Sequence, residues 1–129
     1  EDLTGFTFGI WGLAFKPGTD DMRESPSIYI TKELVKRGAH IKVYDPKAIE
    51  EAKEHYLKGV HNITYLTSKY DVLKNADALV LLTEWKEFRS PDFDKIKSLL
   101  KSPIIFDGRN QYITYELENK GLEYYRIGK

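Results

Sequence analysis

Charged side chains are concentrated in one short stretch near the N-terminus. Five of the nine residues from 16 to 24 are charged, namely Lys16, Asp20, Asp21, Arg23 and Glu24. Lysine and arginine recognise phosphate groups through charge-assisted hydrogen bonds, and neighbouring carboxylates can hold such cations in place. The stretch is therefore suited to binding an anion, although a solvated polar loop without a ligand would explain the same residues equally well.

A second cation follows an apolar run further along the chain. Residues 103–106 read as a buried strand, and Asp107, Gly108 and Arg109 come directly after it. If the strands are parallel, Arg109 and Lys16 lie on the same edge of the sheet, where the two cations could clamp a diphosphate. A type I turn that carries a surface arginine is the alternative reading.

Other candidate residues favour a structural role. Asp45 follows the second predicted strand, where dinucleotide-binding folds place a ribose-binding acid, but the Asp-Pro dipeptide is also an ordinary turn, and we favour the turn. Trp85 could stack on a ligand ring, but we favour a structural role in which it caps the edge of the sheet. The glycines at 9, 12 and 18 do not match the Gly-x-Gly-x-x-Gly dinucleotide fingerprint. The three histidines show no metal-site or triad spacing, so we expect neither a metal nor a catalytic residue in this chain.

The elements that must position these residues alternate regularly along the chain. Apolar runs predict strands at residues 7–14, 40–44, 62–66, 78–82, 103–106 and 122–127. Helices are predicted between them, at 26–37, 47–57, 69–75, 93–100 and 113–120. This alternation predicts an α/β fold, with a Rossmann-like, doubly wound and mostly parallel sheet of five to six strands in three α/β/α layers. Residues 1–129 are expected to form a single domain.

Composition excludes several classes of function. Twenty basic and twenty acidic side chains cancel, which argues against a nucleic-acid-binding protein. The absence of cysteine excludes disulfides and a cysteine nucleophile within this chain. Neither a membrane span nor a signal-peptide pattern is present, so no membrane partner and a cytoplasmic location are expected. The chain begins with Glu1 rather than methionine, which suggests a piece of a longer protein.

Four motifs together resemble one known family. Residues 12–27 read GLAFKPGTDDMRESPS, and VYDP, TEWKEF and FDGR follow at 43–46, 83–88 and 106–109. This pattern closely resembles the C-terminal, UDP-sugar-binding domain of the UDP-glucose/GDP-mannose dehydrogenase family, over nearly the whole chain. The TEWKEF run is most similar to the members that act on UDP-glucose. Members that act on GDP-mannose or UDP-N-acetylmannosamine, and a stand-alone non-catalytic nucleotide-binding module, stay open as alternatives.

The resemblance implies an activity that this chain would share with other domains. The family oxidises the C6 alcohol of a nucleotide sugar to a carboxylate, as from UDP-glucose to UDP-glucuronate. Two hydrides pass to NAD, and the sugar is held as a thioester on a cysteine. By resemblance, that cysteine, the main NAD-binding domain and the central dimerisation domain lie upstream, and the full-length enzyme is a homodimer. The isolated chain is therefore expected to be catalytically inactive.

The resemblance also assigns roles to residues of the charged stretch. Phe15 and Lys16 correspond to a pair that contacts the UDP-sugar, and Arg109 corresponds to a further substrate contact. Arg23 corresponds to an arginine that reaches NAD from across the cleft. From charge complementarity, we expect Asp20 and Asp21 to orient these cations.

Overall fold

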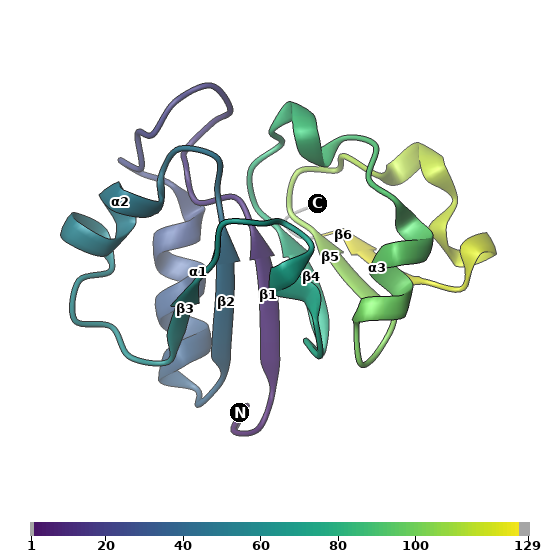
Figure 1. Cartoon of the computed structure of the whole chain (residues 1–129), viewed down its shortest axis with the longest axis horizontal. Helices are drawn as coiled ribbons and strands as arrows, with labels where there is room; N and C mark the ends of the chain where they lie inside the picture. The colour runs from purple at the N-terminus through teal and green to yellow at the C-terminus, as the bar shows by residue number, and fades with distance from the viewer. Residues whose placement is uncertain (1, 127–129) are drawn as a thin grey trace.

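Six parallel strands form one sheet in the computed structural model of the protein, which describes residues 2–126. The strands are β1 (Thr7–Trp11), β2 (His40–Tyr44), β3 (Ile63–Tyr65), β4 (Ala78–Leu81), β5 (Ile104–Asp107) and β6 (Glu123–Arg126). They lie in the order β3-β2-β1-β4-β5-β6, and every neighbouring pair is parallel (Figure 1). The predicted doubly wound sheet is confirmed.

Helices and short turns connect the strands. The helices are α1 (Pro26–Lys36), α2 (Ile49–Glu51), which continues as a π-helical turn (Ala52–Tyr56), and α3 (Phe93–Leu99). The 3₁₀ turns are η2 (Asp71–Leu73), η3 (Lys86–Phe88), η4 (Ile113–Tyr115) and η5 (Leu117–Lys120). Helix α1 begins where Ser25 accepts a hydrogen bond from the Ser27 N–H at 3.2 Å, and it ends before Gly38, whose φ is 102°.

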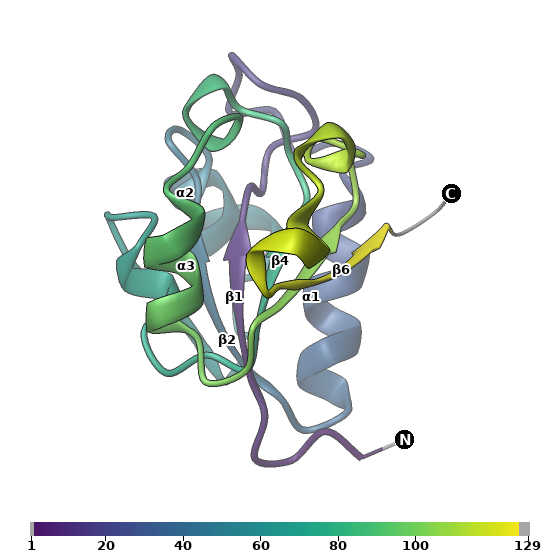
Figure 2. The same cartoon turned by 90° about the vertical axis from the view of Figure 1, so that its right-hand side faces the viewer.

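The two faces of the sheet bury separate apolar clusters, because successive residues of a strand point to opposite faces. Ile10 packs with Ile41 and Val43 under α1, whereas its neighbour Trp11 packs with Leu79 on the other face. Helix α3 and the C-terminal 3₁₀ turns cover that second face, and Figure 2 shows α1 across the sheet from them. The three-layer arrangement is therefore confirmed.

Two predicted helices are much shorter in the structure. Of residues 69–75, only η2 is helical, and the chain leaves it through Asn75 at a φ of 60°. Residues 113–120 form η4 and η5 instead of one helix, because Glu116 between them has a left-handed φ of 53°. Left-handed residues interrupt a right-handed helix, and these two segments are too short to propagate through them.

Strand ends also differ slightly from the prediction. β1 ends at Trp11 rather than at residue 14, because Gly12 has a φ of 104° that no regular strand contains. β6 ends at Arg126, and residue 127 of the predicted strand lies outside the described residues. The early end of β1 matters for the site, since it frees the following residues to form a loop.

The strand order creates a switch point between β1 and β4. From β1 the chain proceeds outward to β2 and β3, and from β4 it proceeds in the opposite direction to β5 and β6. Loops at the carboxyl ends of such neighbouring strands diverge and leave a crevice that binds ligands. Because all the strands are parallel, the loops that carry Lys16 and Arg109 emerge at this same edge.

Candidate functional site

The loop after β1 is anchored firmly at its base. Gly12 donates to the Tyr44 carbonyl at 2.8 Å, and a Cβ added at Gly12 would lie 2.6 Å from the Thr83 nitrogen. The Thr83 hydroxyl donates to the Ala14 carbonyl at 2.7 Å. Only glycine permits both the positive φ and the close approach, so this residue joins the loops after β1, β2 and β4.

The charged part of the loop projects beyond this base. The Phe15 N–H donates to the Asp21 carbonyl at 2.7 Å and closes residues 15–21 into a turn. The hydroxyls of Ser25 and Ser27, at the start of α1, donate to the Leu13 carbonyl at 2.9 and 2.6 Å. Within the turn, the Phe15 side chain is 43% exposed and Lys16 is also exposed. The loop therefore exposes the aromatic ring of Phe15 and the ammonium group of Lys16 on a backbone that hydrogen bonds hold in place.

Asp45 links three loops at the switch point. One carboxylate oxygen accepts from the N–H groups of Leu13 and Ala14 at 2.7 and 3.0 Å and from the Trp85 indole at 3.1 Å. The other accepts from the N–H groups of residues 47 and 48, both at 2.8 Å. Asp45 is only 3% exposed. It makes the predicted turn, and it also joins that turn to the loops after β1 and β4.

The bonds of Asp45 occupy backbone N–H groups at the position where dinucleotide-binding loops contact phosphate. In glycine-rich dinucleotide loops, backbone N–H groups face the phosphates, but here the N–H groups of Leu13 and Ala14 donate to Asp45. Ser25 likewise caps the first turn of α1. Five donors also saturate the four lone pairs of Asp45, so this acid has no acceptor left for a ribose hydroxyl. The N–H groups of Leu13 and Ala14 are therefore not available to an anion, which leaves the cationic side chains at this edge as the candidate contacts.

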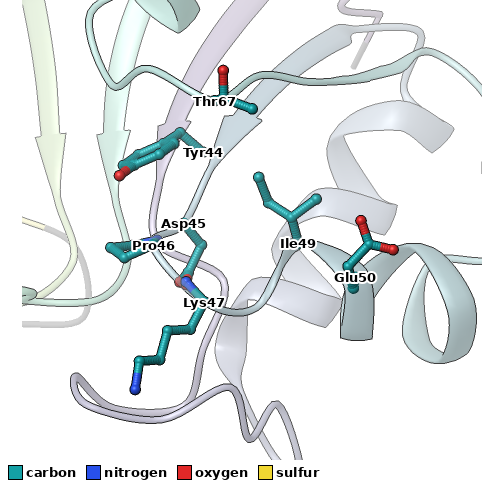
Figure 3. A pocket seen from close by; sticks show the side chains of 7 residues that line it. All are labelled: Tyr44, Asp45, Pro46, Lys47, Ile49, Glu50 and Thr67. Carbon is teal, nitrogen blue, oxygen red and sulfur yellow. The ribbon is translucent and has the colours of Figure 1, made fainter.

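A shallow pocket of about 330 Å³ lies beside Asp45, at the end of β2. Figure 3 shows Tyr44 and Ile49 bordering it, with Lys47 extending past Asp45 toward the loop after β1. The Tyr44 hydroxyl donates to Glu87 at 2.7 Å, and burial followed by this bond raises the pKa of Tyr44 above its ordinary value. Tyr44 is therefore a neutral, fixed wall of the pocket.

Asp21 holds Arg23 in a fork-like ion pair. The Arg23 Nε lies 3.1 Å from Asp21 Oδ1, and Nη2 lies 2.9 Å from Oδ2. The side chain of Arg23 is 79% exposed. The side-chain hydrogen bond from Arg23, together with its backbone bond, lowers the pKa of Asp21 to about 2. The pair borders a small hollow of about 270 Å³ with Phe15 and Glu24, so Arg23 is directed by its partner and still accessible.

Arg109 is held in a comparable way by Glu84. The Arg109 Nε lies 2.6 Å from Glu84 Oε1, and both side chains are about one-third exposed, at 33% and 31%. Burial works to raise the pKa of Glu84, but the bond from Arg109 and the other favourable interactions outweigh it and lower the pKa. The fully buried Asp107 accepts from the Arg109 N–H at 2.9 Å and from the Tyr124 hydroxyl at 2.7 Å. Asp107 therefore holds the backbone of Arg109 in place, and Glu84 holds its side chain.

The predicted site residues thus fall at one edge of the sheet. Lys16 and Arg109 follow β1 and β5, with β4 lying between these strands. Asp21 contacts Arg23, whereas Asp20 is exposed on the same loop. Trp85 packs against both apolar clusters, which agrees with the capping role favoured from the sequence.

Sequence reasoning missed the partners of these residues. It did not identify Glu84 as the partner of Arg109, and it did not give Asp45 and Asp107 their linking roles. The available signal was an aspartate directly at or after the end of a buried strand, followed by a tight turn with N–H groups to bind. The distant donors of Asp45, in contrast, leave no trace in the local sequence.

Residues 2–126 contain neither a candidate membrane-spanning helix nor a candidate cluster of metal ligands. None of their helices has the length and apolar character needed to cross a membrane. No group of three histidine, cysteine or acidic side chains in this part of the chain is arranged to hold a metal ion.

The chain matches a known family model over most of its length. Residues 9–114 match the model described as the UDP-glucose/GDP-mannose dehydrogenase family, UDP binding domain. A UDP-glucose 6-dehydrogenase from Pseudomonas aeruginosa is 42% identical over 127 residues, which cover 97% of this chain and 28% of the relative. The chain therefore spans little more than a quarter of that relative.

Solved structures of longer proteins contain the same fold. A UDP-glucose dehydrogenase from Pyrobaculum islandicum superposes with a TM-score of 0.74 at 29% identity, covering 96% of this chain and 26% of that one. An NDP-N-acetyl-D-galactosaminuronic acid dehydrogenase from Methanosarcina mazei superposes with a TM-score of 0.77 at 29% identity. The superposed part covers 100% of this chain and 26% of the Methanosarcina mazei chain. The fold is thus similar to about one quarter of each protein.

Proposed function

The chain belongs to the UDP-glucose/GDP-mannose dehydrogenase family, and from this premise we propose that it is the nucleotide-sugar-binding, C-terminal domain of an NAD-dependent UDP-glucose 6-dehydrogenase. The complete enzyme would oxidise UDP-glucose to UDP-glucuronate in two hydride transfers. The main NAD site, the catalytic cysteine and the central dimerisation domain belong in this proposal to the upstream part of a homodimeric protein. Because this chain lacks cysteine, the domain alone would bind and not catalyse.

One observation carries the proposal. The backbone N–H groups of Leu13 and Ala14 are occupied by Asp45, while Lys16 and Arg109 follow strands that end at the same edge of the sheet. A diphosphate carries two or more negative charges, and separate cations on either side of β4 would neutralise them through charge-assisted bonds. Such an edge suits a nucleoside diphosphate sugar better than a dinucleotide that relies on a glycine-rich cradle.

Each proposed contact has a distinct chemical role. Lys16 would supply a mobile point charge to the diphosphate, and Phe15 an apolar ring surface against the nucleoside or sugar. Arg109, held through Nε by Glu84, would approach the substrate in a preset orientation. A preset arginine loses less side-chain freedom on binding than a free one, so the Glu84 pair would support affinity for the substrate.

Arg23 would serve the cofactor rather than the sugar. NAD would accept the hydride in the complete enzyme, and a cation at this edge would offset the negative charge of its diphosphate. An exposed guanidinium that Asp21 holds through two nitrogens fits that role. Asp20, exposed on the same loop, would add to the field that orients the loop cations.

Calorimetric titration of the chain with UDP-glucose tests the substrate contacts. We expect Lys16→Ala and Arg109→Ala each to weaken binding roughly ten- to hundredfold, as the loss of one charge-assisted contact predicts. Lys36→Ala is the matched control, because it removes the same charge from the last turn of α1, at the opposite end of the sheet. Unchanged affinity in both edge variants would refute the assignment of the site.

The identity of the sugar nucleotide has a second candidate. The similarity to the Methanosarcina mazei enzyme favours a dehydrogenase of another nucleotide sugar, since its fold superposes as well as that of the UDP-glucose enzyme. Titrations with UDP, UDP-glucose, UDP-N-acetylmannosamine and GDP-mannose separate the candidates. Tighter binding of UDP-glucose than of UDP alone supports the proposal, whereas tighter binding of another sugar nucleotide selects that substrate.

A further inference from the structure

A second candidate site lies at the end of β2, in the pocket beside Asp45. The pocket has a volume of about 330 Å³, at the lower end of the range of about 300–1,000 Å³ that is typical of small-molecule sites. The carboxyl end of β2 adjoins the switch point between β1 and β4, where doubly wound sheets bind ligands. The proposed substrate contacts lie after β1 and β5, so this pocket has no role in them.

The walls of the pocket are apolar and held in place. Figure 3 shows Tyr44 and Ile49 facing each other across it. The Tyr44 ring meets the Phe88 ring at 72° with centroids 6.0 Å apart, and its hydroxyl donates to Glu87 at 2.7 Å. The Lys69 ammonium lies 3.7 Å from the other oxygen of the Glu87 carboxylate. An aromatic ring fixed by these contacts and faced by an aliphatic side chain forms a slot for a flat group such as a nucleobase.

Three polar side chains at the rim of the pocket can bond to a ligand. Lys47, Glu50 and Thr67 are exposed, and none of their side chains forms a hydrogen bond or an ion pair within residues 2–126. Asp45 also lines the pocket, but its five donors leave it no free acceptor. A ligand could therefore bond to the three rim side chains without breaking a bond of the protein.

We propose that this pocket binds a nucleoside monophosphate at the same time as the substrate edge binds the nucleotide sugar. The base would occupy the slot between Tyr44 and Ile49. Lys47 would bond to the phosphate, and Glu50 would accept from the ribose hydroxyls. Figure 3 shows the two charged side chains on different sides of the slot, Lys47 extending toward the loop after β1 and Glu50 lying beyond Ile49. This separation suits a ligand that carries an anion and hydroxyl donors on different sides of a ring.

The charges at the rim favour this class of ligand over other small molecules. An aromatic carboxylate would satisfy Lys47, but it would bring a second negative charge near Glu50 and offer that acid no donor. Inorganic phosphate would leave the slot beside Tyr44 empty. No cluster of three metal ligands occurs in residues 2–126, so a metal ion is disfavoured as well. A nucleoside monophosphate uses the ring, the cation and the acid together.

The backbone next to the pocket contains an irregularity that is frequent at functional sites. Helix α2, whose Ile49 and Glu50 line the pocket, continues as the π-helical turn Ala52–Tyr56. In this turn the Leu57 N–H donates to the Ala52 carbonyl at 2.7 Å. Such turns are rare, and many of them occur beside binding or catalytic residues. This observation supports the site independently of the shape and charge of the pocket.

NMR titration of the chain with AMP tests the proposal. We expect the amides of residues 44–50 and the ring of Tyr44 to shift and to reach saturation. Lys47→Gln should weaken AMP binding about tenfold, since it removes a charge-assisted contact. Glu50→Gln should weaken binding by only about threefold, because the amide keeps an acceptor oxygen without its charge.

Matched control variants make the same chemical changes outside the pocket. Lys58 and Glu54 are exposed residues that follow α2 and do not line the pocket. Lys58→Gln and Glu54→Gln should therefore bind AMP as tightly as the unchanged chain. Shifts that do not saturate, or a Lys47→Gln variant that binds AMP as well as the Lys58→Gln control, would overturn the proposal.

Two partial ligands test whether the parts of the pocket act together. Adenosine lacks the phosphate and inorganic phosphate lacks the ring, so each should bind about tenfold or more weakly than AMP. Lys47→Gln should leave adenosine binding unchanged, since its partner is absent from that ligand. If inorganic phosphate binds as tightly as AMP, the pocket does not recognise a nucleoside and the proposal is wrong.

Competition with UDP-glucose separates this site from the proposed substrate contacts. We expect the AMP shifts to persist in saturating UDP-glucose and in Lys16→Ala, and Lys47→Gln to bind UDP-glucose with unchanged affinity. Displacement of AMP by UDP-glucose, or loss of AMP binding in Lys16→Ala, would overturn the proposal of a second site. Failure of AMP binding with intact UDP-glucose binding contradicts only this site, and the reverse result contradicts only the substrate assignment.

Discussion

The substitution Asp45→Asn tests whether one buried carboxylate holds the site together. The amide retains one acceptor oxygen and replaces the other with an NH₂ group. If that group faces Leu13, Ala14 and Trp85, three donors lose their acceptor and meet another donor. If the amide is turned over, the N–H groups of residues 47 and 48 lose theirs instead. At least two donors are therefore left without an acceptor in either orientation.

The size of the effect follows from the burial of these groups. A hydrogen bond to a charged acceptor contributes about 1.5–3 kcal/mol, and a buried donor left unsatisfied loses most of it. Two such losses, with some relaxation, predict a decrease of about 3–5 kcal/mol in the free energy of unfolding. Domains of this size are stable by about 5–15 kcal/mol, so the variant should fold but be strongly destabilised.

Urea unfolding, followed by the fluorescence of Trp11 and Trp85, measures this loss. The matched control is Asp77→Asn, which makes the same chemical change at an aspartate whose carboxylate accepts from the Thr7 N–H at 2.8 Å. Its amide can turn to keep that single bond, so a loss of about 1 kcal/mol or less is expected. If Asp45→Asn costs no more than the control, Asp45 does not link the loops and the reasoning is wrong.

Two other perturbations follow from the same loop. Gly12→Ala should lower the free energy of unfolding in urea by about 2 kcal/mol or more, since its Cβ would lie 2.6 Å from Thr83. Gly59→Ala is the control, because Gly59 has a φ of 80° but open space around it, and it should lower that free energy by only about 1 kcal/mol. Equal losses in the two variants would exclude the close approach as the cause. The Asp21 carboxyl should titrate near pH 2 by NMR and move toward 3.8 in Arg23→Gln. Because the folded-state pKa is lowered, the stabilisation by this pair is complete above about pH 4 and is lost as the pH falls toward 2; an unshifted titration in the variant would contradict the ion pair.

Much of the fold was predictable because its signals are local. The apolar run of β4 and the alternation of strands with helices indicate a parallel sheet without any knowledge of contacts. Ser25 and Pro26 mark the start of α1, and Gly38 marks its end, because caps and stops act within one turn of the helix. The helices predicted at 69–75 and 113–120 form only 3₁₀ turns, because segments this short do not propagate a helix and the left-handed Glu116 interrupts the second one.

The candidate site, like the fold, could be predicted from the sequence only where its signals are local. The residue types of the charged loop, and the family to which the chain belongs, can be read from consecutive positions, as can the ion pair between Asp21 and Arg23, which are two residues apart. Asp45, however, bonds to Leu13 and Trp85 across 32 and 40 positions, and Arg109 bonds to Glu84 across 25. Only the parallel packing of the strands brings these partners together, because local sequence preferences act over a few residues and hydrogen bonds require contact in space.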